Sequence, residues 1–190
     1  MTAQAPTLWT IGHSTREWPV FVAMLQEARI EALADVRRFA GSRRHPQFHG
    51  QAMAEALPRE GIGYLPMPEL GGRRAPRADT RNTAWRNKGF RGYADYMETP
   101  QWQAARDRLM QLALSRRTAV MCAEALWWQC HRGLIADSLK ARGWAVIHLQ
   151  APGRSEEHPY TAAARIVDGD LLYSEPVAAH PQARLFPGDQ

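Results

Sequence analysis

The sequence predicts a single α/β domain with a mostly parallel sheet of about five strands, helices on both faces and a short C-terminal β-hairpin. Strand-like and helix-like segments alternate about five times, which favours parallel strands joined by crossing helices. The 190 residues suit one domain, and 45% apolar with 23% charged residues is ordinary globular composition. Asp168 and Gly169 lie between apolar runs and predict a tight hairpin turn.

The first part of the predicted fold is strand, helix, strand. Residues 8–12 (LWTIG) are short and apolar, as expected of a buried strand. Apolar residues then recur at helical spacing over residues 18–30, and Pro19 lies near the first turn, where its missing N–H has no helical partner. Residues 30–37 (IEALADVR) are the second predicted strand.

The next elements follow a polar stretch, residues 37–50. A helix is predicted at about 51–60, and Gly61 ends it because glycine is common directly after helices. Residues 62–67 (IGYLPM) are the third predicted strand.

Residues 69–92 are predicted to be a long loop. Between Arg73 and Arg91 it holds six arginines and one lysine against a single acid, Asp79. Loops longer than about 12–15 residues are usually functional or disordered, so a flexible solvated loop is one alternative. Interleaved aromatic residues favour the other alternative, a nucleic-acid surface, because they stack on bases beside arginine. The residues proposed for this surface are Arg73, Arg74, Arg86, Arg91, Trp127 and Trp128.

The second half continues the alternation. Helices are predicted over residues 91–98, 101–115 and 130–143, and strands over 118–122 (TAVMC) and 144–149 (WAVIHL). The core is therefore expected within residues 8–150, with 151–190 as a C-terminal extension of the same 1–190 domain that carries the hairpin.

Charge and hydropathy suggest where the chain works and what it binds. The 24 Lys+Arg exceed the 19 Asp+Glu, and most of the cations are arginine, which suits phosphate and carboxylate. Nucleic acid or a phosphorylated small molecule is the expected partner, with a merely biased soluble surface as the alternative. No apolar run approaches a membrane span and no signal peptide is evident, so we expect no membrane association and a cytoplasmic protein.

Polar side chains collect where the predicted strands end. Ligands of parallel α/β sheets bind outside the carboxyl ends of the strands, so these side chains are expected to share one pocket. As catalytic groups we predict carboxylates that activate water and histidines that transfer protons: Glu124, Asp35, His13 and His131. As anion-binding groups we predict Arg16, Arg37, Ser42, Arg43, Cys130, Arg132 and Ser14.

Several of these residues have structural alternatives. Asp35 could only hold Arg37 or Arg43 in a buried ion pair, and His13 and Ser14 could cap the following helix. Glu124 could likewise cap a helix. Trp127 and Trp128 could pack as a lid or stack on a substrate ring.

The two cysteines allow further alternatives. Cys122 is expected in the core, whereas Cys130 begins a helix and should have a lowered pKa that makes it nucleophilic. Their spacing is not that of zinc knuckles, so we predict no cofactor or metal. A metal held by Cys122, Cys130 and His131 remains an alternative.

Long motifs resemble the domain-of-unknown-function family 488. They are TIGHSTR, DVRRFAGSRRHPQF, GIGYLPMPELGGRR, FRGYADYM and VMCAEALWWQCHRGLIADSL, in the family's order from Thr10 to about Leu149, with an echo in HPYTAAA. The resemblance implies an α/β domain that carries the same polar blocks. Members usually have proline at the position of Ala40, and often one where this chain has Trp127 and Trp128, so these loops differ in shape.

Three functional hypotheses follow. The first is an enzyme acting on an anionic substrate, preferably a nucleotide or nucleic acid, by a hydrolytic or base-removing reaction of the DNA-repair kind. The second is a non-catalytic nucleic-acid-binding module. The third is a thiol- or metal-dependent enzyme that uses Cys122 and Cys130.

Overall fold

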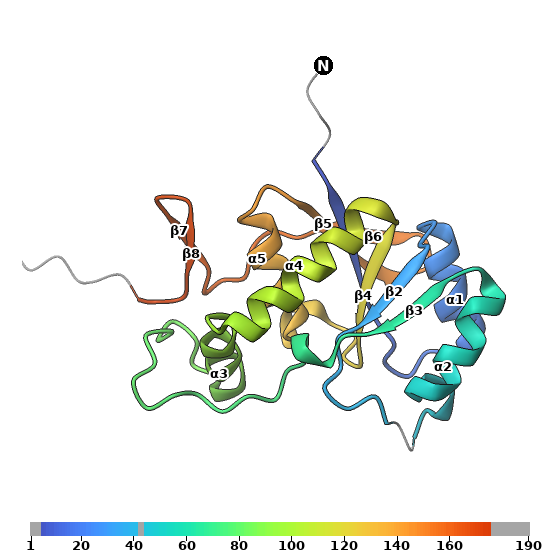
Figure 1. Cartoon of the computed structure of the whole chain (residues 1–190), viewed down its shortest axis with the longest axis horizontal. Coiled ribbons are helices and arrows are strands. Elements are labelled where there is room, and N and C mark those ends of the chain that lie inside the picture. Colours follow the sequence, from blue (N-terminus) through green and yellow to red (C-terminus); the bar gives the residue numbers. More distant parts are fainter. Residues whose placement is uncertain (1–4, 42–43, 176–190) are drawn as a thin grey trace, which may run out of the picture.

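A computed structural model describes residues 5–41 and 44–175 and contains a six-stranded sheet of order β3-β2-β4-β1-β5-β6 (Figure 1). The first five strands in this order run parallel, and only β6 is antiparallel to its neighbour β5. The strands are β1 Thr7–Gly12, β2 Ala32–Asp35, β3 Gly63–Pro66, β4 Thr118–Cys122, β5 Ala145–Ala151 and β6 Arg154–Glu157.

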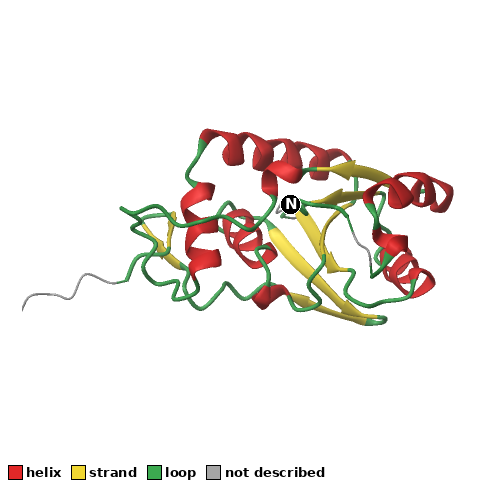
Figure 2. Cartoon of the chain, turned by 90° about the horizontal axis from the view of Figure 1, so that it is seen from below, coloured by secondary structure: helices red, strands yellow, loops and turns green. Residues whose placement is uncertain are grey.

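Helices cover both faces of the sheet (Figure 2). On one face α1 and α2 bury Phe21 and Met53 in a cluster with Ile11 of β1. On the other face α3, α4 and α5 pack on the opposite side chains of the strands, such as Val120 of β4. The helices are α1 Trp18–Glu27, α2 Gly50–Ala56, α3 Lys88–Met97, α4 Pro100–Ser115 and α5 Arg132–Lys140.

Because helices cover both faces of the sheet, both sides of its central strands are buried, which explains why these strands are apolar in sequence. In β4, Ala119 and Met121 face the α1–α2 cluster while Val120 faces the other one. Strands buried on both faces lose the alternation of polar and apolar residues, so TAVMC is continuously apolar. The predicted α/β class, the parallel order and the helices on both faces are confirmed.

The C-terminal hairpin is also confirmed. Its strands are β7 Arg165–Val167 and β8 Asp170–Leu172, which pair antiparallel. Asp168 and Gly169 between them have φ of 51° and 88°. Positive φ at both central residues is the requirement of the tight turn predicted from Asp-Gly.

The sixth strand, β6, is absent from the sequence prediction. It pairs with β5 at the edge of the sheet, and all four of its residues are exposed. An exposed edge strand rich in charge has no apolar alternation to reveal it, and the charges protect the edge against pairing with other chains.

The arginine-rich segment is shorter than predicted and is hydrogen-bonded to α3. A 3₁₀ turn at Pro68–Leu70 precedes it, and α3 already begins at Lys88. The buried carboxylate of Asp95 in α3 accepts hydrogen bonds from the Thr80 hydroxyl and from the Asn82 amide, at 2.5 and 2.8 Å. The segment therefore contacts a second acid, Asp95, besides its own Asp79.

None of the helices in the described part of the chain has both the length and the apolar character needed to cross a membrane.

Candidate functional site

A cavity of about 320 Å³ opens at the carboxyl ends of β2 and β4, beside the start of α5. Its floor holds Cys122, Cys130 and His131, and its rim holds Glu124 as the one acid. The remaining charged and aromatic lining residues are Arg37, Arg38, Phe39, Arg73, Phe90 and Tyr93.

A larger hollow, of about 550 Å³, lies among α3, α4, α5 and the hairpin and is lined by neither cysteine nor histidine. Two of its arginines are already paired, Arg81 with Glu98 and Arg106 with Asp107. The smaller cavity is therefore the candidate site, because it alone among the described hollows is lined by cysteine and histidine together with arginine.

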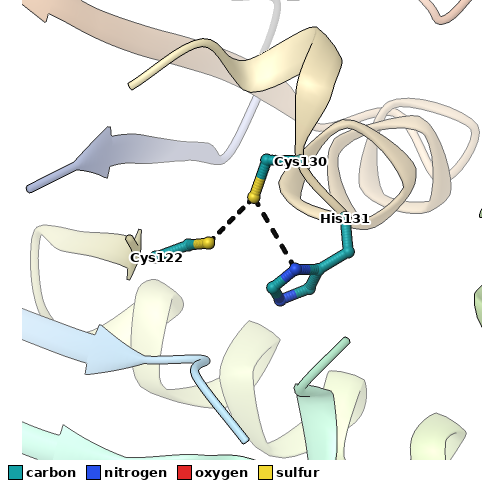
Figure 3. Close-up of side chains that lie close together, drawn as sticks. All are labelled: Cys122, Cys130 and His131. Atoms are coloured by element: carbon teal, nitrogen blue, oxygen red, sulfur yellow. Dashed lines mark hydrogen bonds between the residues drawn. The ribbon is translucent and has the colours of Figure 1, made fainter. Parts of the chain in front are cut away.

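Cys122 and Cys130 face each other in the floor of the cavity (Figure 3). Their Sγ atoms are 2.9 Å apart, and both are free cysteines with side chains buried to 5% and 3% exposure. Cys122 is the last residue of β4, while the Cys130 carbonyl accepts the first bond of the α5 turn, from Gly133 N–H at 3.0 Å. The segment between them folds back so that strand end and helix start meet.

The ring of His131 lies with Nδ1 toward Cys130. Its Nε2 lies 3.1 Å from the Val36 carbonyl oxygen, which can only accept, so Nε2 carries the hydrogen. The other nitrogen, Nδ1, lies 3.6 Å from Cys130 Sγ (Figure 3). A Cβ on Gly72 would come within 2.9 Å of Nδ1, so glycine is required for the loop to pass this ring.

The pKa values of the two thiols are shifted in opposite directions. Burial alone raises the pKa of Cys130, but the hydrogen bond from Cys122 and the charge and N–H of Arg132 lower this pKa to about 6. The hydrogen bond to Cys130, together with burial, raises the pKa of Cys122. At neutral pH the pair is a Cys122 thiol that donates to a Cys130 thiolate.

Arg132 is a buried cation that supports this thiolate. Its side chain is 1% exposed, and its guanidinium donates to the carbonyl oxygens of Glu124 and Ala125, at 2.6 and 3.3 Å, and to the Thr10 hydroxyl. Within the described ranges, no carboxylate lies at ion-pair distance from it. Since a buried charge needs a partner, the Cys130 thiolate complements Arg132.

The anion-binding roles predicted for Arg132 and Arg16 are therefore corrected. Neither side chain lines the cavity. Arg16 donates to the carbonyl oxygens of Gly12 and Gln150. Sequence reasoning missed this because backbone carbonyls, the partners of both arginines, leave no trace in a sequence.

Asp35 and Arg37 form the ion pair considered as the structural alternative. Arg37 Nε and an Nη donate to the two oxygens of the buried Asp35 carboxylate at 2.8 and 2.6 Å. The Tyr64 hydroxyl donates to the same carboxylate at 2.6 Å. Asp35 is thus occupied and lies outside the cavity lining, so its predicted role in activating water is corrected; Arg37 does line the cavity.

His13 lies behind Arg37 rather than in the cavity. Its ring stacks on Phe48 with centroids 4.4 Å apart, and its Nε2 is 3.3 Å from an Arg37 Nη. Burial, followed by the charge of Arg37, outweighs the hydrogen bond with Ser14 and lowers the pKa of His13 to about 4. The ring is therefore neutral at pH 7 and is not the proton carrier predicted for the site.

Of the two serines predicted to bind an anion, only Ser14 lies within the described residues. Ser14 contributes its backbone, with its N–H donating to the Ala123 carbonyl at 2.9 Å, and its side chain does not line the cavity. Ser42 lies outside the described residues, as does Arg43.

The residues of the predicted nucleic-acid surface do not form one patch of free cations. Arg73 is exposed at the cavity, and Arg86 is also exposed. Arg74 stacks on the ring of Tyr96, 3.6 Å from its centroid, and Arg91 donates to the Trp85 carbonyl.

The two tryptophans are placed differently from each other. Trp127 is buried, and one face of its ring stacks on His148 at 4.5 Å and 6°, so its predicted stacking on a base is corrected. Trp128 is 48% exposed and meets Trp127 edge-on.

A buried chain of polar residues was missed by sequence reasoning. Thr10 Oγ1 lies 2.7 Å from His148 Nδ1, His148 Nε2 lies 2.9 Å from His158 Nδ1, and His158 Nε2 lies 2.8 Å from an Asp137 oxygen. The four residues belong to β1, β5, the segment after β6 and α5, so no local pattern joins them. The only available signal was the HPYT motif of the family resemblance.

The cysteine pair fits thiol chemistry better than zinc. The ligand atoms of Cys122, Cys130 and His131 lie within 4.8 Å of one another, and no fourth such side chain joins them in the described part. Tetrahedral zinc with bonds of about 2.3 Å to sulfur holds two sulfurs about 3.7 Å apart. The observed separation of 2.9 Å is shorter than this.

The comparisons with known proteins identify the family. The family model described as Domain of unknown function DUF488 matches residues 17–139. The chain belongs to this family. The resemblance seen in the sequence is thus confirmed, and in this DUF488 chain the matched residues include both cysteines, His131 and Arg132. No curated protein and no solved structure matches.

Proposed function

We propose that this chain is a thiol-dependent enzyme whose Cys130 thiolate attacks an anionic substrate in the cavity. The observation that carries the proposal is the contact between Cys130 Sγ and Cys122 Sγ at 2.9 Å, at the start of α5 and open to the cavity. A thiolate at a helix N-terminus beside a fixed guanidinium is a typical activated nucleophile. Nδ1 of His131 lies 3.6 Å from the same sulfur.

The cavity lining supports an anionic and partly aromatic substrate. Arg37, Arg38 and Arg73 outnumber Glu124, and the apolar part of the wall is aromatic. A volume of about 320 Å³ lies at the lower end of the range for ligand pockets, which suits a nucleotide or a single flipped nucleotide. A cytoplasmic location belongs to this proposal, since reduced thiols persist there.

The chemistry follows from the order of the groups. Cys130 sulfur forms a bond to the electrophilic atom of the substrate while the bond to the leaving group breaks. Because Cys130 is already a thiolate, the leaving group departs as an anion and takes its proton from water in the cavity. Glu124, exposed at the rim, then activates the water that releases the product. For a nucleotide the attacked atom is the anomeric carbon in base removal, or phosphorus in hydrolysis.

The nucleophile is tested by alkylation and activity together. We expect iodoacetamide to label Cys130 alone in the folded protein, with a rate that rises around pH 6, the pKa given to this thiol. Turnover of nucleoside monophosphates or short single-stranded DNA should vanish in Cys130→Ser. Full turnover in Cys130→Ser would reject the proposal, and so would preferential labelling of Cys122.

The substrate class is tested by binding. Thermal stabilisation by phosphate and by nucleoside monophosphates should be lost in Arg73→Ala. Arg59→Ala removes an exposed charge near the end of α2, far from the cavity lining, and should keep it. If both variants lost this thermal stabilisation equally, the binding would depend only on the net charge of the protein and not on the cavity.

A non-catalytic nucleic-acid module is the second candidate. The exposed Arg73 and Arg86 on the segment before α3 favour it. It predicts affinity for single-stranded nucleic acid that falls steeply with salt and survives Cys130→Ser unchanged. Binding without any product, in both the native protein and Cys130→Ser, would select this candidate over the enzyme.

A further inference from the structure

We propose that Cys122 and Cys130 are a reversible dithiol–disulfide couple that a small hydroperoxide oxidises, with Cys130 attacking and Cys122 resolving. The thiolate enzyme proposed above needs only Cys130, whereas this inference assigns a covalent role to its neighbour. It rests on the contact of the two sulfur atoms in the cavity floor and on the rigid elements that hold them.

The geometry is close to that of a bond. The sulfur atoms are 2.9 Å apart, and a disulfide needs about 2.05 Å, so they have to approach by less than one ångström. Cys122 lies within the sheet, paired with Gly12 of β1, and is held by its backbone. Cys130 follows segment 123–129, which is mostly exposed.

The environment gives the two sulfurs different tasks. The backbone N–H of Arg132 points to Cys130 Sγ at 3.5 Å and supports the attacking thiolate. Cys122 remains a thiol, because the hydrogen bond with Cys130 and burial raise its pKa. Because both side chains are at most 5% exposed, a bulky disulfide has poor access, whereas hydrogen peroxide enters through the cavity.

The chemistry balances in two steps. Cys130 thiolate attacks one peroxide oxygen, the O–O bond breaks, an S–O bond forms, and the departing hydroxide takes a proton to become water. Cys130 is then a sulfenic acid, oxidised by two electrons. Cys122 sulfur attacks it, the S–S bond forms, and the hydroxyl leaves with the Cys122 proton as a second water. A dithiol reductant reverses the change.

The disulfide would have two consequences. It would tie the last residue of β4 to the start of α5 and close segment 123–129 into a ring. It would also remove the thiolate, so oxidation would switch off the proposed activity; this second consequence rests on the proposed function, and the first does not.

The test uses the folded full chain and equimolar hydrogen peroxide at pH 7. After alkylation of the remaining thiols in denaturant, we expect the native protein to have lost two hydrogens and to carry no alkyl group, with a Cys122–Cys130 cross-link in its peptides. Cys122→Ser should instead hold a sulfenic acid that dimedone traps. Cys130→Ser should react slowly and keep an alkylatable Cys122.

Specific outcomes would overturn the inference. One is a sulfinic acid at Cys130 of the native protein while Cys122 is still alkylated. Another is protection of both thiols by stoichiometric zinc that a chelator removes. Peptide mapping of the native protein decides the matter even if the variants do not fold. A disulfide in the native protein together with full turnover in Cys130→Ser would sink the proposed enzyme alone; abolished turnover without a disulfide would sink this inference alone.

Discussion

Arg132 carries a full positive charge in the interior, held by carbonyl oxygens and by a neighbouring thiolate rather than by a carboxylate. Its guanidinium fixes the backbone after β4 through the Glu124 carbonyl, and its N–H and charge act on Cys130. One side chain therefore couples loop shape to thiol acidity. That coupling explains why Arg132 follows directly after Cys130 and His131.

Replacing Arg132 by methionine should raise the pKa of Cys130 from about 6 toward the value of an ordinary thiol. The loss of a nearby cation disfavours the thiolate. Thiolate absorbance against pH measures the shift. Arg108→Met, on the exposed side of α4, is the control and should leave the midpoint unchanged. An unshifted midpoint in a folded Arg132→Met protein would contradict the role given to Arg132.

At Gly12, the end of β1 lies close to the backbone that follows β4. A Cβ there would lie 1.8 Å from the Glu124 carbonyl oxygen, which no side-chain movement relieves. We expect Gly12→Ala to lower the free energy of unfolding by about 3 kcal/mol, as overpacked sites do. Gly41→Ala adds a Cβ with nothing within 4 Å and should be nearly neutral. Urea unfolding compares the two, and equal stabilities would refute the close approach.

At the scale of elements, α5 joins the site to the segments that follow β6 and β8. Its first turn carries the reactive residues, and its middle carries Asp137, which is fully buried. The Asp137 carboxylate accepts from His158, from the N–H and hydroxyl of Thr161 and from the hydroxyl of Tyr173. This helix is thus fixed to the segment after β6 and to the end of the hairpin.

Asp137→Asn should destabilise the fold by about 2–4 kcal/mol, because an amide places donors against the donors that the carboxylate satisfied. Denaturant unfolding followed by circular dichroism measures the change. Asp107→Asn alters a largely exposed carboxylate on α4 and should cost below about 1 kcal/mol. Similar losses in the two variants would argue against a special position of Asp137.

The sequence predicted most elements of this fold because their signals are local. The continuously apolar β4, the helical spacing of α4 and the Asp168–Gly169 turn each depend on a few neighbouring residues. The edge strand β6 has no such signal, since its exposed residues pack on nothing.

The location of the site was predictable from the sequence, whereas the contacts of its individual residues were less so. Parallel strand ends had to bring Cys122, Glu124 and His131 to one edge, and they do. Whether an arginine meets a carbonyl, as Arg16 does, or a carboxylate, as Arg37 does, depends on contacts between distant segments. These contacts decide which polar residues serve the fold and which face the cavity.

At the scale of the whole molecule, buried neutral histidines make stability depend on pH. Burial, with the charge of Arg37, lowers the pKa of His13 to about 4; burial, with the charges of His158 and Arg132, lowers that of His148 to about 2. The unfolded chain takes up these protons near pH 6.5, whereas the folded chain does not until its own lower pKa. Their stabilising contribution is therefore complete above about pH 6.5 and is lost as pH falls.

Cys130 extends the same trend to higher pH. Its folded pKa of about 6 lies below that of an unfolded thiol, about 8.5, so the unfolded state again binds more protons over this interval. Its contribution is present above about pH 8.5 and is lost as pH falls toward 6. Both kinds of group therefore make stability rise with pH, histidines in the acid range and Cys130 in the neutral range.

We expect the free energy of unfolding, measured by urea at a series of pH values, to rise from pH 4 to pH 8. His13→Gln removes one of the histidines and should flatten the rise between pH 4 and 6.5, while leaving the slope between pH 6.5 and 8 unchanged. Cys130→Ser should flatten the rise between pH 6.5 and 8 and leave the slope below pH 6.5 unchanged, because serine does not ionise in this range. His49→Gln, which replaces an exposed histidine at the start of α2, is the control for the loss of an imidazole. A slope below pH 6.5 that is the same in His13→Gln and in the native chain would mean that His13 is protonated in the folded state, and that the neutral ring beside Arg37 is wrong.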